Sequence, residues 1–375
     1  MTSPAALAAV LRFPGESLSL EQVDIGPLLP DEVLVRLVGS GICHTDLGVI
    51  AEPGEGQTPI VLGHEGSGVV ERVGSAVDTV RPGDHVVMSY DCCWNCDNCS
   101  RGLPMHCREF VALNLIGGRA DGTSALSTQD GPVHGHFFGQ SAWATYAVAS
   151  SRNCVVVDAD LPLEMLAPLG CGIQTGAGAV LNTLRPEPGS SIAIFGVGSV
   201  GLAALLAATT CGCSEIIAVD LADSRLAVAA ELGATHTINA SDTDVVQAIR
   251  GFTGGLGTWY SVDCIGVQSA VRSALECLQS PGVCATVGFQ GASNELTFDQ
   301  GHLLFGRSLV GVIEGDAIPA AFVAEMIAMY RSGAFPFDRL ITTYPFEQIN
   351  DAIHAVHAGK VIKAVLTFGG ARSSR

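Results

Sequence analysis

Basic residues are scarce in this chain. Its 375 residues include 19 Lys and Arg against 37 Asp and Glu, which gives a formal net charge of -18. A surface that faces nucleic acid or an anionic membrane needs a basic patch, so the composition argues against both as partners. Any anion that the protein binds must therefore be held locally.

Long apolar runs and export signals are also missing. No stretch reaches the length that spans a bilayer, and residues 1–12 lack the basic start and the cleavage site of a secretion signal. The sequence contains no internal repeat and no low-complexity tract. We therefore expect a cytoplasmic globular protein with no membrane partner, and its length suggests about two domains.

Cysteine is plentiful, and its distribution favours metal binding over disulfides. There are 13 Cys, an odd number in a chain without an export signal, which indicates reduced thiols. Cys93, Cys96, Cys99 and Cys107 follow the spacing C-x2-C-x2-C-x7-C, which predicts a closed tetrahedral zinc site of the structural kind. Cys92 could take the place of Cys93 in this register, and the alternative is a set of ordinary reduced thiols.

A second group of candidate ligands is dispersed along the chain. Cys43 lies in Gly-Ile-Cys-His-Thr-Asp, His64 lies in Gly-His-Glu-Gly, and Cys171 lies in Leu-Gly-Cys-Gly. Three N and S ligands would leave a fourth position on zinc for water or substrate, as in catalytic sites. Taken singly, a cysteine such as Cys171 is more often a small buried apolar residue than a ligand, and a histidine such as His64 is more often a hydrogen-bonded core residue.

The pattern of strands and helices changes near residue 190. Before it, short alternating runs predict strands at 31–38, 66–74 and 80–88, and a helix at 173–184 follows. After it, strands alternate with helices, which predicts parallel βαβ units. The expected strands are 192–195, 215–220, 235–238, 259–264 and 282–289, and the expected helices are 202–210, 224–232 and 245–250. The last segment predicts helices at 320–331 and 347–358 and a strand at 361–368.

A glycine-rich loop joins the first of these strands to its helix. Gly196, Gly198 and Gly201 form a G-x-G-x-x-G motif, and Asp220 stands at the end of the next strand. In this context the motif predicts a dinucleotide site, where the helix N-terminus faces the pyrophosphate. Asp220 would bind the ribose hydroxyls and repel a 2′-phosphate, which favours NAD over NADP. Arg225 is the counter-indication, and a helix N-cap is the alternative role for Asp220.

Together these motifs resemble the zinc-dependent medium-chain alcohol dehydrogenases over nearly the whole chain. The run 163–176 is similar to the aryl- or benzyl-alcohol dehydrogenase branch. The resemblance implies an α/β fold with a β-rich GroES-like catalytic domain and a Rossmann domain, a doubly wound parallel sheet that binds NAD. The expected boundaries are 1–172 for the catalytic domain, with its zinc lobe near 90–110, then 173–313 for the Rossmann domain and 314–375 for a segment returning to the first.

The resemblance also implies roles by position. Cys43, His64 and Cys171 would bind a catalytic zinc, and the four-Cys lobe a structural zinc. Glu65 matches a carboxylate that can approach the metal, and Thr45 matches the residue that hydrogen-bonds the alcohol. His44 and Lys363 match contacts to the pyrophosphate, and Thr175 and Val200 match residues that pack on the nicotinamide. Hydride would pass from a zinc-bound alkoxide to NAD. The hydroxyl proton of the alcohol must leave before the hydride, and in many relatives a relay of groups that carries it ends in a His. This chain has Gly48 at that position, so we expect the proton to leave through Thr45 and the cofactor ribose to water.

Substrate and assembly are implied by position as well. Phe137, Phe138, Phe289 and Ile313 resemble pocket residues, and such walls favour a primary aromatic or allylic alcohol. The alternative is that these phenylalanines belong to the core. Residues 116–136 resemble a loop of dimeric relatives, so we expect a homodimer, with a tetramer as the alternative.

Three functions are compatible with these patterns. The first is an NAD-dependent aryl- or allyl-alcohol dehydrogenase, acting reversibly on a small-molecule alcohol or aldehyde. The second is a dehydrogenase of a glutathione-type thiol adduct of formaldehyde, whose anionic substrate calls for basic residues that the chain has few of. The third is a non-catalytic zinc- and nucleotide-binding redox sensor, in which the protein supplies all four zinc ligands.

Overall fold

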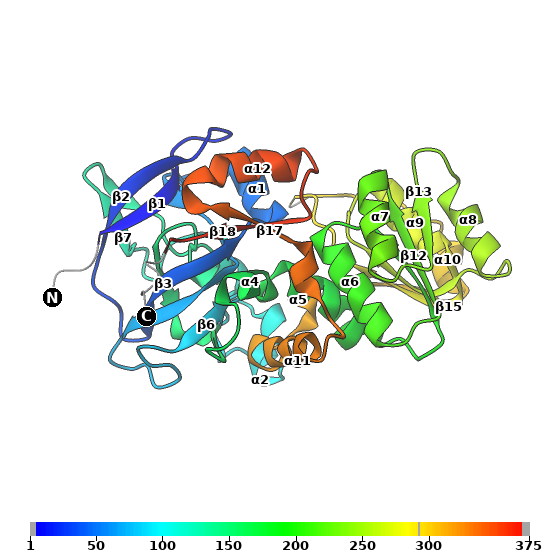
Figure 1. Cartoon of the computed structure of the whole chain (residues 1–375), viewed down its shortest axis with the longest axis horizontal. Coiled ribbons are helices and arrows are strands. Elements are labelled where there is room, and N and C mark those ends of the chain that lie inside the picture. Colours follow the sequence, from blue (N-terminus) through cyan, green and yellow to red (C-terminus); the bar gives the residue numbers. More distant parts are fainter. Residues whose placement is uncertain (1–4, 292, 370–375) are drawn as a thin grey trace. The chain divides into compact units, whose positions relative to one another are not determined.

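The chain forms two compact units. The computed structural model describes residues 5–291 and 293–369 (Figure 1). Unit 1 combines the chain up to Cys171 with Ile318–Glu325 and the chain from Ile341 onward. Unit 2 consists of Gly172–Ala317 and Met326–Leu340.

Unit 1 is built on two sheets. The 5-stranded sheet has the order β4-β1-β2-β7-β8, and the 7-stranded sheet has the order β10-β6-β5-β3-β18-β17, with β9 also paired to β3. The strands of the first sheet are β1 (Ala6–Leu11), β2 (Ser19–Ile25), β4 (Ile60–Val61), β7 (Leu126–Thr128) and β8 (Gly131–Val133). Those of the second are β3 (Glu32–Gly41), β5 (Gly66–Val73), β6 (His85–Met88), β9 (Tyr146–Ser150), β10 (Cys154–Val157), β17 (Ile341–Pro345) and β18 (Lys363–Thr367).

The helices of unit 1 are short. The α-helices are α1 (His44–Ala51), α2 (Asp97–Ser100), α3 (Phe110–Asn114), α4 (Leu163–Leu166) and α12 (Ile349–His357). The 3-10 turns are η1 (Pro104–His106), η2 (Phe137–Gly139), η3 (Ser151–Asn153), η4 (Ala167–Gly170) and η8 (Phe346–Gln348). Loops and turns therefore carry many of the candidate site residues in this unit.

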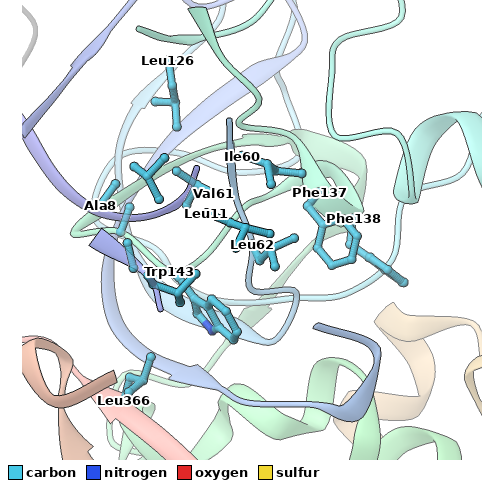
Figure 2. Packing of buried hydrophobic residues seen from close by; sticks show 14 of the residues in the cluster. Ala8, Leu11, Ile60, Val61, Leu62, Leu126, Phe137, Phe138, Trp143 and Leu366 are labelled. Carbon is cyan, nitrogen blue, oxygen red and sulfur yellow. The ribbon is translucent and has the colours of Figure 1, made fainter. Parts of the chain in front are cut away.

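Strand β3 lies in the interior of unit 1 because both of its faces are apolar. Successive side chains of a strand point to opposite faces, so Val33, Val35 and Leu37 enter one buried cluster and Leu34 enters another. The second cluster is drawn in Figure 2, where Ile60, Val61 and Leu62 run through its centre. This core supports the turn that carries Phe137 and Phe138.

Unit 2 has the doubly wound parallel sheet that the sequence predicts. Its 6 strands have the order β13-β12-β11-β14-β15-β16, and every pairing is parallel. The chain reverses its direction of winding between β13 and β14, so a switch point lies between β11 and β14, where such folds bind ligands. The strands are β11 (Ser191–Phe195), β12 (Glu215–Asp220), β13 (His236–Asn239), β14 (Thr258–Asp263), β15 (Leu278–Thr286) and β16 (Arg307–Gly311).

Helices connect these parallel strands. With right-handed crossovers, α6 and α7 cover one face of the sheet and α8 and α9 the other, and Ala193, Phe195 and Ile217 pack with residues of α8 and α9. The helices are α5 (Gly172–Gly178), α6 (Ser199–Thr210), α7 (Asp223–Glu231), α8 (Val245–Phe252), α9 (Gln268–Glu276) and α10 (Gln300–Leu304). The rest are the π-helical turn η5 (Ala179–Leu184), η6 (Glu314–Asp316), η7 (Phe337–Leu340) and α11 (Pro319–Arg331), whose residues are divided between the units.

The structure shifts the limits of the strand predicted at 282–289. Strand β15 begins and ends earlier than the predicted 282–289, because a bulge carries its pairing back to Leu278 and its last partner in β14, Asp263, is the final residue of that strand. Within the segment 314–375, residues 314–317 and Met326–Leu340 belong to unit 2. The domain boundaries proposed above remain predictions.

The helices of the described residues are too short or too polar to cross a membrane. None combines the length and the apolar character that a bilayer-spanning helix requires.

A buried ion network anchors the loop between α3 and η2 to the start of β3. Arg119 lies 2.6 Å from Glu32, and His136 Nε2 lies 3.0 Å from the same carboxylate. Burial alone would raise the pKa of Glu32, but hydrogen bonds with His136, Arg119 and the Leu29 N–H lower that pKa to about 2. The ionised carboxylate therefore stabilises the folded state at every pH above its unfolded pKa.

We expect Glu32→Gln to lower the free energy of unfolding at neutral pH by about 3 kcal/mol, because it leaves Arg119 buried without its counter-charge. The wild type should lose this contribution as the pH falls from about 4.5 to about 2, whereas the variant should not. Urea unfolding across this range measures both effects. Glu71→Gln is the control, since its ion pair with Arg36 is about 40% exposed. An equal loss in the two variants would contradict the prediction.

Candidate functional site

The dispersed candidate ligands converge in unit 1. One ligand atom each from Cys43, His64, Glu65 and Cys171 lies within 4.8 Å of the others. Cys43 precedes α1, His64 and Glu65 lie between β4 and β5, and Cys171 follows η4. The tertiary fold therefore brings together groups that the sequence holds far apart.

The imidazole of His64 is oriented by a residue that the sequence analysis did not identify. His64 Nδ1 lies 2.9 Å from Asp46 Oδ1, while Nε2 is buried and has no hydrogen-bond partner among the described residues. A proton shared with the carboxylate at Nδ1 leaves the Nε2 lone pair available to a metal. Asp46 stands three residues after Cys43 and accepts its backbone N–H, the spacing of a capping box, which was the available signal.

Backbone geometry delivers His64 to this position. Gly63 has a φ of 89°, and a Cβ there would lie 2.4 Å from Trp143 Cδ1. Only glycine tolerates both the left-handed conformation and the close approach of the indole. Trp143 Nε1 in turn donates to Gly41 O at 3.2 Å, which ties the segment to the end of β3.

The local electrostatics prepare one of the candidate ligands, the Cys43 thiol, for metal binding. A hydrogen bond from Cys171, together with the nearby His64 and Lys363, holds the pKa of Cys43 well below its usual range despite burial. Burial opposes a charge on His64, but the Asp46 carboxylate raises the pKa of the imidazole. The thiolate is the form that binds a metal, so this environment prepares Cys43 as a ligand.

Glu65 is held beside the thiols by a buried ammonium. Lys363 Nζ lies 2.6 Å from the Glu65 carboxylate and donates to Ile42 O at 3.0 Å. Burial is the main cause that raises the pKa of Glu65, and the positive charge of Lys363 opposes it. Lys363 thus occupies an ion pair in the fold, and its expected contact with a pyrophosphate remains a prediction.

The donor set fits zinc. Two thiol sulfurs and one imidazole nitrogen are the ligands of a three-coordinate protein site with one open position. Cys43, Cys171 and His64 could hold the ion, and Glu65 is close enough to occupy the fourth position. When the carboxylate stays on Lys363, the open position remains available to a substrate oxygen.

Helix α1 carries the other residues expected near the substrate. Thr45 Oγ1 lies 3.9 Å from Cys43 Sγ, and His44 is exposed at the start of the helix. Gly48 is exposed one turn later, and a Cβ there would meet no atom within 4 Å. Space for water beside Gly48 is therefore present in the fold.

The four-Cys lobe also gathers its sulfurs. Cys93, Cys96, Cys99 and Cys107 have their Sγ atoms within 4.8 Å of one another. The backbone N–H of Cys93 donates to Cys107 Sγ, and that of Cys96 to Cys93 Sγ, both at 3.3 Å. Cys92 lies outside this group, and burial raises the pKa of its thiol to about 12. Such a closed tetrathiol set suits a structural zinc.

The glycine loop of unit 2 has the close contacts that its motif predicts. Gly196 has a φ of 83°, and a Cβ on Gly201 would lie 1.9 Å from Gly196 O. Gly198 is the N-cap of α6, and a Cβ there would meet no atom within 4 Å. Helix α5 packs on the start of α6, because a Cβ on Gly176 would touch Val200 O at 1.9 Å. Thr175 and Val200 therefore lie in adjacent helices.

Asp220 ends β12 beside this loop. Its Oδ2 accepts the Val197 N–H at 2.9 Å, and its Oδ1 accepts the N–H of Leu221 and of Ala222. The N-cap of α7 is Ala222, so Asp220 does not serve as that cap. Arg225 Nη1 lies 3.8 Å from Asp220 Oδ2, which places a positive charge beside the carboxylate.

The expected pocket residues are divided between the units. In unit 1 the Phe138 ring stacks on His64 with centroids 4.4 Å apart, and the Phe137 ring meets His64 edge-on at 5.7 Å. Both rings also belong to the buried cluster of Figure 2. In unit 2, Phe289 is 70% exposed and Ile313 is 37% exposed. Phe137 and Phe138 can therefore belong to the core and also present a ring edge or face beside His64.

Comparison with known proteins matches both halves of the chain. Residues 29–159 match the alcohol dehydrogenase GroES-like domain, and residues 199–331 match the zinc-binding dehydrogenase family. A geraniol dehydrogenase of Castellaniella defragrans is 46% identical over 367 residues, which are 97% of this chain and 98% of that protein.

Two solved structures are similar over almost their whole length. An alcohol dehydrogenase zinc-binding domain protein from Burkholderia ambifaria is 46% identical, with a TM-score of 0.95, and the match covers 98% of this chain and 100% of the other. A benzyl alcohol dehydrogenase from Acinetobacter calcoaceticus is 41% identical, with a TM-score of 0.94 and the same coverage.

Proposed function

The chain belongs to the zinc-dependent medium-chain alcohol dehydrogenases, and we propose that it oxidises primary allylic or aromatic alcohols to aldehydes, reversibly, with NAD. In each turnover the alcohol loses a hydride to NAD⁺ and its hydroxyl proton to solvent, which yields aldehyde, NADH and H⁺. The observation that carries the proposal is the open donor set of Cys43, His64 and Cys171, lined by aromatic rings.

The chain's own residues prepare the reaction. A bound zinc would supply Lewis acidity that favours deprotonation of the alcohol, and NAD⁺ would accept the hydride. Asp46 fixes the imidazole of His64, and Lys363 holds the Glu65 carboxylate. Thr45, beside Cys43, would accept the hydroxyl proton and pass it on toward water.

The choice of NAD over NADP rests on Asp220. Its carboxylate follows β12, where the ribose hydroxyls of a dinucleotide bind in this fold. A 2′-phosphate would meet a negative charge there, and Arg225 offsets only part of it from 3.8 Å. His44, Lys363, Thr175 and Val200 are proposed cofactor contacts by position.

A second zinc per chain is proposed for the lobe. Four sulfurs within 4.8 Å of one another leave no position for a substrate, so this ion would stabilise the fold. Its sulfurs already accept backbone N–H groups, the usual partners of thiolate ligands.

The relatives and the aromatic rings support an apolar substrate. Two similar proteins are named for geraniol and for benzyl alcohol, an allylic and an aromatic alcohol. Phe137 and Phe138 pack on His64, so an apolar group beside the carbinol would meet aromatic carbon. Phe289 and Ile313, which unit 2 leaves exposed, are the further proposed contacts.

A homodimer is the proposed assembly, with a tetramer as the alternative. Strand β16 is an edge of its sheet, and Leu304 and Phe305 beside it are 68% and 72% exposed. An open edge next to exposed apolar side chains favours pairing with a second copy. A monomer in sedimentation velocity would contradict this assembly.

A cytoplasmic location is proposed from the thiols. None of the 13 Cys, all of which lie within the described residues, forms a disulfide. Reduced thiols in this number suit a reducing compartment.

The proposal is tested by cofactor reduction with geraniol, benzyl alcohol, ethanol and the glutathione adduct of formaldehyde. We expect turnover with NAD in preference to NADP, and a kcat/KM for geraniol and benzyl alcohol about 10²-fold above that for ethanol. Chelation should abolish turnover, and added zinc should restore it. Preference for ethanol or for the adduct would contradict the substrate class. Turnover without metal would contradict the mechanism, and zinc binding without turnover on any alcohol would indicate the sensor.

A further inference from the structure

Gln140 lies directly after η2 and is fully buried. Its side-chain amide bonds to three backbone groups in two other segments. Oε1 accepts the Gly66 N–H at 2.9 Å, and Nε2 donates to His64 O at 2.9 Å and to Ser89 O at 3.1 Å. The same amide therefore touches the segment that carries His64 and the end of β6.

We propose that Gln140 is a positioning residue of the metal centre, which sets the separation of His64 and Cys171 by clamping the backbone segments that carry them. The inference rests on the proposed function, because it requires that these two residues bind zinc. Gln140 itself is not among the candidate ligands.

The first link fixes the backbone around His64. The amide bonds to the carbonyl of His64 and to the N–H of Gly66, so it bridges both sides of Glu65. The neighbouring backbone continues the contact, since Ala142 N donates to Gly63 O at 2.7 Å. Rotation of this segment about its axis would move the imidazole, and the bridge opposes that rotation.

The second link reaches Cys171 through Ser89. Gln140 Nε2 holds the Ser89 carbonyl, and Ser89 Oγ donates to Gly170 O at 2.7 Å. Gly170 is the residue before Cys171, and a Cβ on it would lie 2.0 Å from Met88 O, so the two segments are already in close contact. A displacement of Ser89 is therefore transmitted to the Cys171 backbone.

Only an amide of this length satisfies all three groups. Two carbonyls require two N–H donors, and one N–H requires an acceptor, which is the inventory of a glutamine side chain. Glutamate would offer oxygen to two carbonyls, and methionine would remove all three hydrogen bonds of the amide. Loss of a hydrogen bond that orients the side chain of a metal ligand commonly changes metal affinity 10- to 100-fold, and we expect loss of this backbone clamp to act in the same range.

The test follows zinc release from the purified holoenzyme to the chromophoric chelator 4-(2-pyridylazo)resorcinol. Cys171→Ala identifies the phase that belongs to this centre, because that phase should be missing. We expect Gln140→Met to accelerate the same phase about 10- to 100-fold, with the other zinc unchanged. The visible spectrum of the Co²⁺-substituted protein should also shift, since it reports ligand geometry.

Asn114→Leu is the matched control. Asn114 is also fully buried, and its amide makes three hydrogen bonds, to Asp91 N, Asp91 O and Phe110 O, next to the four-Cys lobe. It should leave the phase assigned to Cys171 unchanged. Equal acceleration of that phase in both variants would mean general destabilisation and would overturn the proposal, as would release from Gln140→Met within twofold of the wild type.

Ser89→Ala decides the question if Gln140→Met does not fold. This change removes the hydroxyl that bonds to Gly170 O and leaves the Gln140 amide in place. Release of the zinc assigned to Cys171 should be several-fold faster, and an unchanged rate would overturn the link. A purified wild type that contains no zinc by metal analysis would instead contradict the proposed function.

Discussion

Cys171→Ala is expected to reduce alcohol oxidation about 10³-fold or more and to remove one zinc ion per chain. The remaining groups at the centre, Cys43, His64 and Glu65, would offer one sulfur in place of two. Zinc would then have fewer soft ligands, and the environment that lowers the pKa of Cys43 would lose its largest contribution, the hydrogen bond from Cys171.

The measurement combines metal analysis by atomic emission with kcat/KM for geraniol and benzyl alcohol. Cys284→Ala is the control, because Cys284 is equally a buried thiol but lies in β15, away from both groups of candidate ligands. It should retain both zinc ions and nearly full activity. Wild-type activity in Cys171→Ala, or full zinc content, would remove Cys171 from the proposed ligand set.

Gly201→Ala is expected to lower the affinity for NAD at least 10-fold and the free energy of unfolding by about 2 kcal/mol. The new Cβ would lie 1.9 Å from Gly196 O. Neither the backbone of Gly201 nor Gly196 O can move away without separating α6 from β11. The N-terminus of α6 would then no longer face the pyrophosphate at the required distance.

Gly198→Ala should separate the effect on the cofactor from the effect on the fold. Gly198 has a φ of -75°, and a Cβ there would meet no protein atom within 4 Å, so the thermal midpoint should stay unchanged. NAD should still bind at least 10-fold more weakly, because the second glycine of the motif admits the pyrophosphate. Titration calorimetry and thermal unfolding measure the two quantities. A weaker fold with normal NAD affinity would contradict this assignment.

Local patterns account for much of what could be predicted. The four-Cys lobe could be predicted because its candidate ligands lie within one short segment, where their spacing limits how far apart the sulfurs can be. The sequence left open whether Cys92 or Cys93 is the first member, and the structure places Cys93 in the group. The glycine loop could be predicted for the same reason, since strand, turn and helix follow each other directly and Asp220 ends the next strand.

The limits of strand β15 could not be predicted from its own residues. The apolar run continues beyond Thr286, but the pairing of β15 ends there, because its partner strand β14 ends at Asp263. Phe289 consequently lies outside the strand and is exposed. Which strand a residue pairs with depends on a neighbour that is distant in sequence.

The partners of the candidate ligands depended on long-range packing as well. Asp46 was within a recognised motif, yet its contact with His64 requires α1 and the β4–β5 connection to meet. Lys363 matched a phosphate contact by position, but the pairing of β18 with β3 brings its ammonium to Glu65. The role of Gln140 had no signal in its own sequence context.

The sequence by itself determined the parallel sheet with its glycine loop and the clustering of four Cys in one lobe, because periodicity and short spacings are local properties, and its motifs carried the resemblance to the family. Only the tertiary structure decided that Cys43, His64, Glu65 and Cys171 share one centre. It also decided which side chains orient them. Side chains far apart in a chain meet only where strand register and core packing place their segments, and these depend on the whole unit.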